Sequence, residues 1–197
     1  MESTLNTLNW YAEQAERTYC FQEEVVERAR NIQVESRLGK TLLTEDRSQR
    51  LMHGILGMSG EAGEITSCNS EADNFEDSLW KEIGDWMWYF ATAAKALDKS
   101  IARIFTSGST IHRDQVMHIT ISSNAMIESL KKWLYYGKPM DLLEIEKAML
   151  NACAWIWEMA GYDEANMQDI LKGNIEKLQK RFPDKFTAAD AIARVDA

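Results

Sequence analysis

The chain has 197 residues, of which 45% are hydrophobic, and this is enough to bury a core without the help of a disulfide or a metal. Its 31 acidic residues outnumber 22 basic ones and give a net charge of -9, which disfavours nucleic acid and anionic membranes as partners. A negatively charged substrate therefore needs a bound cation to come close.

The three cysteines lie far apart and form no CxxC motif, which predicts reduced thiols rather than a disulfide framework or a zinc site. The first residues lack a basic region followed by an apolar core, and no segment approaches the about 20 apolar residues that span a bilayer. We expect a soluble, unprocessed, cytoplasmic protein without a membrane partner.

Apolar residues recur at spacings of three and four along most of the chain, without the alternation of a half-buried strand. This pattern predicts an all-α fold, a helical bundle. The first helix is expected over about residues 7–37, with Gly39 as its stop, and the second over about residues 46–69. A polar connection over residues 70–74 leads to a third helix that reaches Leu97.

Residues 106–110 (TSGST) form the clearest break in the chain. After it we expect helices over about residues 113–136, 141–160 and 163–181, with Gly161 between the last two. The second half of the chain thus repeats the helix count of the first.

This repetition predicts a single domain, residues 1–197, in which two similar halves pack as a pseudo-dimer. The first half, residues 1–105, carries the acidic site, and residues 111–197 comprise the second half and the closing helix. The break between the halves is too short to separate independent domains.

Two acidic motifs lie on the second and third predicted helices. Glu61 and Glu64 are three residues apart, and so are Glu82 and Asp85, so each pair occupies one helix face with about 5 to 6 Å between neighbours. If the two helices form an antiparallel hairpin, the four carboxylates face one another and can share a cation.

Three glycines flank these acids inside the helices: Gly60, Gly63 and Gly84. Each costs about 1 kcal/mol relative to alanine, which makes sense where another backbone or a ligand approaches closely. The third helix is apolar nearly all round, so Glu82 and Asp85 are not expected to be merely solvated.

A ligand set made only of carboxylate oxygens suits a hard cation, Mg²⁺ or Mn²⁺, rather than zinc or copper. A di-iron carboxylate bundle uses Glu-x-x-His motifs, and none of His53, His112 and His118 has that spacing. We interpret His53 as a structural residue.

The order of the two motifs, GMSGEAGE at 57–64 and EIGDWMWY at 82–89, resembles the MazG-like, all-α nucleoside triphosphate pyrophosphohydrolases. The segments LNWY at 8–11 and AERT at 15–18 look like the first helix of that family. The segment NIEKLQKRFP at 174–183 looks like its closing helix, so the resemblance covers both ends of the chain.

This resemblance implies Mg²⁺-dependent hydrolysis of (deoxy)nucleoside triphosphates to the monophosphate and pyrophosphate. The four acids would be both metal ligands and catalytic residues, with one glutamate helping a metal-activated water as general base. It further implies that Asn174 and Lys177 touch the nucleotide, and we add Lys81, beside Glu82, to the candidate substrate-binding residues.

The family follows its first motif with a Lys-Lys pair and an aromatic-Gly-Lys-Pro turn, but here that place holds SCNSE at 67–71. The basic element instead occurs as LKKWLYYGKP in the second half, and aligning on it places Ser122 and Ala125 at the positions of the first acidic motif. The second half therefore resembles a degenerate repeat.

Our hypothesis is a composite site to which the second half contributes Lys131, Lys132 and Lys138. The alternative is an ordinary basic helix end, where cations favour the dipole. The abundant tryptophans could stack a nucleobase, although at helical spacing they are more often core residues.

Two other functions remain open: a non-catalytic or regulatory nucleotide-binding protein, and a structural helical partner protein. Nothing in the sequence selects the base or sugar, excludes an alarmone or modified nucleotide, or decides whether the chain forms a homo-oligomer. The compact chain resembles phage and bacterial forms of the family, which would place a phage protein in the host cytoplasm.

Overall fold

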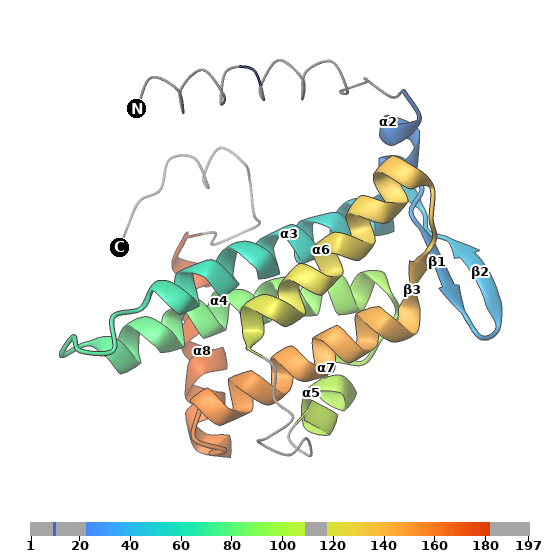
Figure 1. Ribbon diagram of the computed structural model, residues 1–197. Helices are drawn as coiled ribbons and strands as arrows, with labels where there is room; N and C mark the ends of the chain where they lie inside the picture. Colours follow the sequence, from blue (N-terminus) through green and yellow to red (C-terminus); the bar gives the residue numbers. More distant parts are fainter. Residues whose placement is uncertain (1–9, 11–22, 109–117, 182–197) are drawn as a thin grey trace.

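The computed structural model describes Trp10, residues 23–108 and residues 118–181 (Figure 1). These residues form a bundle of helices with a small sheet at one end, which confirms the predicted all-α class. The elements are α2 (Glu23–Arg30), β1 (Gln33–Ser36), β2 (Gly39–Leu42), α3 (Glu45–Ser67), α4 (Phe75–Ala96), α5 (Ile101–Gly108), α6 (Ile119–Tyr136), β3 (Met140–Asp141), α7 (Leu142–Met159) and α8 (Glu164–Arg181).

The sheet is the main departure from the predicted helices. The first helix was expected to continue to residue 37, but α2 ends at Arg30 and β1 pairs with β2 in an antiparallel hairpin, with Val34 opposite Thr41. The short strand β3 adds to β1 in parallel, with Val34 opposite Met140. Gly39 turns the hairpin at a φ of 120°, a conformation that favours glycine, rather than ending a helix.

The pattern behind this hairpin is short. Ile32 and Val34 are buried while Gln33 and Glu35 are not, so the chain alternates in burial over only four residues before the turn. A segment of this length is easily absorbed into a neighbouring helical pattern. The residues of the predicted first helix that precede Glu23 lie outside the described residues, apart from Trp10.

Helices α3 and α4 pack as an antiparallel hairpin. Gly54 of α3 faces Ala93 of α4, and Gly57, further along α3, faces Tyr89, which comes earlier in α4. A Cβ atom added at Gly54 would lie 2.7 Å from Ala93 Cβ, and one at Gly57 would lie 2.1 Å from Tyr89 Cδ1. The two glycines therefore let the helix backbones approach closely. The expected antiparallel arrangement of the acidic helices is confirmed.

Helix α6 packs beside α3, and α7 packs against α6 and α5 (Figure 1). The end of α6 agrees with the prediction, because Gly137 adopts the left-handed conformation after Tyr136. The predicted break at residues 106–110 begins later than expected, because α5 continues to Gly108, where an added Cβ would lie 2.8 Å from Cys153 Cβ. Residues 109–117 are outside the described ranges.

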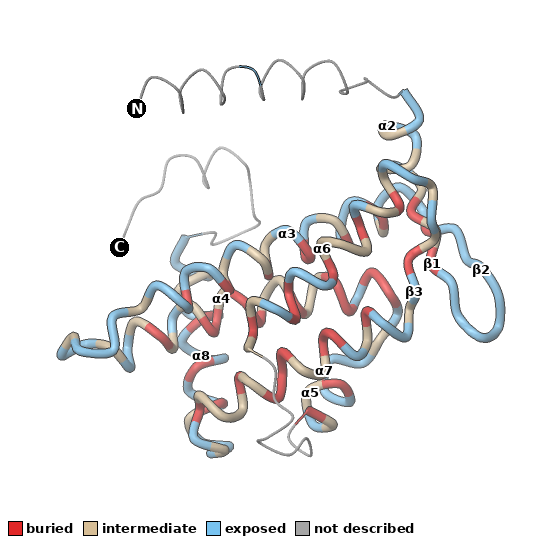
Figure 2. The backbone as a smooth tube through the Cα atoms, viewed as in Figure 1, coloured by how far each residue is buried: buried red, intermediate tan, exposed pale blue. Residues whose placement is uncertain are grey.

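One hydrophobic core runs between these helices, and Figure 2 shows the buried residues on the sides of α3, α4, α6 and α7 that face one another. Its fully buried members come from both predicted halves and include Met58, Trp86, Phe90, Met126 and Ile145. The division into two similar halves stays a prediction. Within the described ranges, every helix is too short or too polar to cross a membrane.

Candidate metal centre

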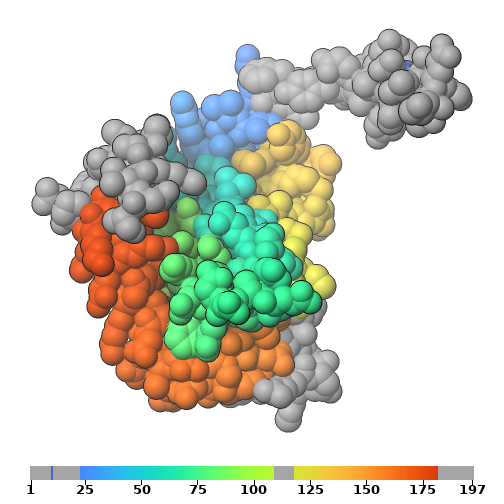
Figure 3. Space-filling view, turned by 90° about the vertical axis from the view of Figure 1, so that its left-hand side faces the viewer, coloured from blue at the N-terminus to red at the C-terminus, as the bar shows by residue number. Residues whose placement is uncertain are grey.

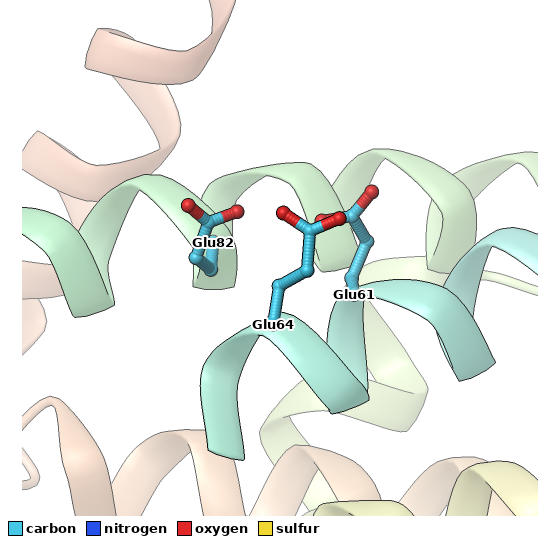
Figure 4. Close-up of side chains that lie close together, drawn as sticks. All are labelled: Glu61, Glu64 and Glu82. Carbon is cyan, nitrogen blue, oxygen red and sulfur yellow. The ribbon is translucent and has the colours of Figure 1, made fainter. Parts of the chain in front are cut away.

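Three glutamates meet at the seam between α3 and α4. Glu61, Glu64 and Glu82 each offer a carboxylate oxygen, and these atoms lie within 4.8 Å of one another. Figure 4 shows the three side chains rising from the two helices toward the same side of the hairpin. The antiparallel packing thus brings together acids that are up to 21 positions apart, taken as the difference between residue numbers 61 and 82.

Asp85, the fourth predicted ligand, is not part of this group. Its Oδ1 and Oδ2 lie 2.6 and 2.5 Å from Lys177 Nζ, and Asn174 Nδ2 donates a hydrogen bond to Oδ1 at 2.6 Å. The ion pair is only partly exposed, with 27% of the lysine side chain and 25% of the aspartate side chain accessible. The predicted quartet is therefore a group of three glutamates beside an ion-paired aspartate.

Helix α8 brings Asn174 and Lys177 to this position. Gly84 makes the approach possible, because a Cβ added there would lie 2.8 Å from Asn174 Cβ. In Figure 3 the surface of α8 lies directly beside that of α4, in agreement with Figure 1. Of the three glycines predicted to permit a close approach, Gly84 is explained by α8, whereas Gly60 and Gly63 have no described atom within 4 Å of an added Cβ.

The carboxylates raise one another's proton affinity. Burial, followed by the charges of Asp85, Glu64 and Glu82, raises the pKa of Glu61 to about 7, although Lys177 opposes the shift. The pKa of Glu82 is raised as well, first by burial and then by Glu64 and Asp85. The charges of Lys177 and Lys81 do not balance this group, so a divalent cation would stabilise its ionised form.

Three rings lie together on the α3–α4 seam, and one of them, that of Tyr89, is close enough to Glu61 to feel its charge. Tyr89 covers Gly57, one helical turn before Glu61, and its ring centroid is 5.3 Å from that of His53 and 5.0 Å from that of Trp88. Burial, and then the charge of Glu61, raise the pKa of Tyr89. Sequence reasoning did not select Tyr89, although its spacing of four from Asp85 places both on one face of α4.

The other tryptophans that might stack a base have different environments. Trp86 is fully buried and stacks on Phe90 at a centroid distance of 5.4 Å, and Trp133 is 8% exposed. Trp157 stacks on Phe105. These three residues are core or near-core residues, whereas the half-buried Trp88 lies beside Tyr89.

The structure separates the basic residues of the second half from the acids. Thr120 Oγ1 lies 3.4 Å from Thr66 Oγ1, so the beginning of α6 is level with the end of α3 that carries Glu61 and Glu64. At the other end of α6, Trp133 Nε1 donates to the carbonyl of Arg28 in α2. No hydrogen bond or ion pair among the described residues joins these lysines to the three glutamates, so the composite site stays a prediction.

Lys131 and Lys132 instead pair with Glu128 on their own helix, and Lys138 follows α6 at the same end. The 11 residues from Thr120 to Lys131 extend about 16 Å along the helix. Lys81 differs from these three lysines, because it is close enough to Glu82 for its charge to oppose, in part, the rise in the pKa of that carboxyl.

The positions aligned with the first acidic motif in the second half are Ser122 and Ala125. Ser122 is fully buried, and its Oγ has no hydrogen-bond partner among the described residues. Ala125 is exposed. A carboxylate at position 122 would therefore lie in the core rather than at an open site, and the repeat stays a prediction.

No protein-family model matches this sequence, and no curated protein or solved structure matches it either. The resemblance to MazG-like pyrophosphohydrolases thus depends on the motifs alone.

Proposed function

We propose that the chain is a Mg²⁺-dependent, MazG-like pyrophosphohydrolase that converts (deoxy)nucleoside triphosphates to the monophosphate and pyrophosphate. The observation that carries the proposal is the convergence of Glu61, Glu64 and Glu82 within 4.8 Å of one another. Asn174 and Lys177, which the resemblance assigns to the nucleotide, lie beside this group through their contacts with Asp85.

The donor set fits Mg²⁺ or Mn²⁺, because both prefer oxygen ligands and the group contains no histidine or cysteine ligand. Its unbalanced negative charge supports the same choice, since the carboxylates repel one another without a cation. When bound, such a cation neutralises charge on phosphate oxygens and lowers the pKa of water.

The residues of the chain then divide into two roles. Glu61, Glu64 and Glu82 hold the cation, and one of them accepts the proton that the attacking water loses. Lys177 and Lys81 donate to phosphate oxygens. The water oxygen forms a bond to the α-phosphorus while the bond from that phosphorus to the bridging oxygen breaks, so pyrophosphate leaves.

The test is to incubate the purified protein with each common NTP and dNTP, with and without Mg²⁺, and to measure monophosphate and pyrophosphate release. Glu61→Gln should abolish release. Glu76→Gln is the matched control, since Glu76 is an exposed acid in the first turn of α4 and lies outside the glutamate group. It should leave the rate unchanged.

The products of this incubation distinguish the proposed hydrolase from a protein that only binds nucleotides. Mg²⁺-dependent release of pyrophosphate that is lost in Glu61→Gln would support the proposal and begin to identify the base. Nucleotide binding without any product would instead indicate a non-catalytic nucleotide-binding protein. Equal rates for Glu61→Gln and Glu76→Gln would contradict the assignment of the glutamates.

A further inference from the structure

The ion pair between Asp85 and Lys177 joins α4 to α8 across 92 positions of sequence. Lys177 contacts both carboxylate oxygens of Asp85, and Asn174 occupies Oδ1 as well. The other buried residues of α8, Met167 and Ile170, are apolar and lie in the first half of the helix. Polar contacts with Asp85 therefore hold the second half of α8 against α4.

These contacts compete directly with metal coordination. A cation that binds Asp85 must take an oxygen that Lys177 now contacts, and it would bring a double positive charge next to the ammonium group. Lys177 forms its ion pair with Asp85, whereas its charge acts on Glu61 and Glu82 only through space, where it opposes the rise in their pKa. Asp85 and the glutamates thus differ in how readily they can accept a cation.

We propose that Lys177 competes with the cation for Asp85, so that Asp85 joins the glutamate group only when nucleotide phosphates draw Lys177 away. This inference rests on the proposed function, because it assumes that a cation and a triphosphate meet at this site. The flexible four-carbon stem of lysine allows the ammonium group to exchange one anionic partner for another. Asp85 is then the ligand that links cation binding to nucleotide binding.

The exchange makes the two binding events cooperative. A nucleotide that removes Lys177 from Asp85 adds a ligand for the cation, and by linkage the cation strengthens nucleotide binding by the same factor. Without nucleotide, the glutamates alone should set the affinity for the cation. This distinction can be measured without turnover.

The experiment is a calorimetric titration of the full chain with Mn²⁺ in the absence of nucleotide. Lys177→Met should bind Mn²⁺ about tenfold more tightly than the unaltered chain, a difference of about 1.4 kcal/mol. Lys180→Met removes the same charge one turn further along α8, where the side chain is exposed, and therefore measures the general electrostatic effect. It should change the affinity by less than about twofold.

Two Asp85 variants test whether the gain depends on that carboxylate. The double variant Lys177→Met/Asp85→Asn should lose the extra affinity of Lys177→Met. Asp85→Asn alone should leave nucleotide-free Mn²⁺ binding within about twofold, since Lys177 already occupies the carboxylate, whereas Glu61→Gln should weaken it by about tenfold or more. Asp85→Asn retains the shape of the side chain and keeps the test available if Lys177→Met fails to fold.

The outcomes separate this inference from the proposed function. Equal Mn²⁺ affinities for Lys177→Met and Lys180→Met, or a loss in Asp85→Asn as large as that in Glu61→Gln, would overturn the competition while leaving the glutamate site intact. If the unaltered chain bound no Mn²⁺, with or without a nucleoside triphosphate, the proposed function would fall as well.

Discussion

Charged side chains lie near both ends of α3, and their surroundings differ. At the C-terminal end, Glu61 and Glu64 approach Glu82, and burial and mutual repulsion raise the pKa of Glu61 and Glu82. Toward the N-terminal end, where the last turns of α6 lie beside α2, Lys131 and Lys132 pair with Glu128 on their own helix. The acidic end keeps uncompensated negative charge, whereas the two lysines share one carboxylate on their own helix.

The comparison shows that the surroundings of a charged motif depend on which helices pack against it. Both the acidic and the basic segments were singled out by their residue pattern in the sequence. The acids meet polar residues of a distant helix, because α8 approaches α4 over Gly84. In the basic segment, Trp133 contacts Arg28 of α2, but Lys131 and Lys132 pair with Glu128 of their own helix. The basic segment is separated from the acids along α6.

The largest expected effect concerns catalysis at the acidic end. Glu82→Gln should lower kcat/KM for the best nucleoside triphosphate by more than about a hundredfold, since even residues that support metal ligands from outside contribute about 10- to 100-fold. Steady-state pyrophosphate release measures this. The exposed Asp77→Asn, on the first turn of the same helix, is the control and should keep full activity.

Two glycine substitutions compare a packed side of the site with an open side. Gly84→Ala should destabilise the protein by about 1 to 3 kcal/mol, because the new methyl group meets Asn174 and displaces α8. Gly60→Ala should instead stabilise α3 by up to about 1 kcal/mol, because no described atom lies within 4 Å of the new methyl group. Urea denaturation measures both changes, and a loss of stability in Gly60→Ala would contradict the open environment.

The pH dependence of stability tests the uncompensated charge directly. The pKa of Glu61 is raised from 4.5 to about 7 in the folded chain, so the folded state binds the proton more tightly than the unfolded state. The resulting stabilisation is fully present below pH 4.5 and is lost as the pH rises through about 7. Because Glu61 is partly exposed, we expect a loss of only about 1 kcal/mol.

Thermal denaturation without metal at about pH 5 and pH 8 measures this loss. Glu61→Gln should remove most of the difference in Tm between the two conditions, and Mg²⁺ should raise the Tm of the unaltered chain most at the higher pH. A Tm that rises toward pH 8 in the metal-free protein would contradict the direction of the pKa shift.

The smallest effect is expected at the basic end. Lys131→Ala should change kcat/KM by less than about twofold, since its side chain pairs with Glu128 at a solvent-exposed position and such pairs contribute at most about 1 kcal/mol. A large rise in KM would support the composite site, with the lysine supplied by the same chain or by a second copy. Size-exclusion chromatography of the same sample would detect that copy.

Local patterns determined much of this protein from the sequence. The spacing of apolar residues predicted the α-helical class, the polar stretch 70–74 separated α3 from α4, and α6 ended at residue 136 as expected. The pairs Glu61/Glu64 and Glu82/Asp85 also followed from one helical repeat. These features depend on neighbours within a few residues, so the sequence contains them directly.

Tertiary packing decided the rest. Residues 33–42 form a hairpin because Val34 is buried under elements that a local pattern does not include. Asp85 is not part of the glutamate group, because Lys177, 92 positions away in the sequence, contacts both of its carboxylate oxygens. The sequence alone thus determined which side chains share a helix face, whereas only the approach of α8 decided that Asp85 is ion-paired while the three glutamates lie together beside it. The physical reason is that helical spacing is a local geometric property, while the partner of a charged group depends on how whole helices pack.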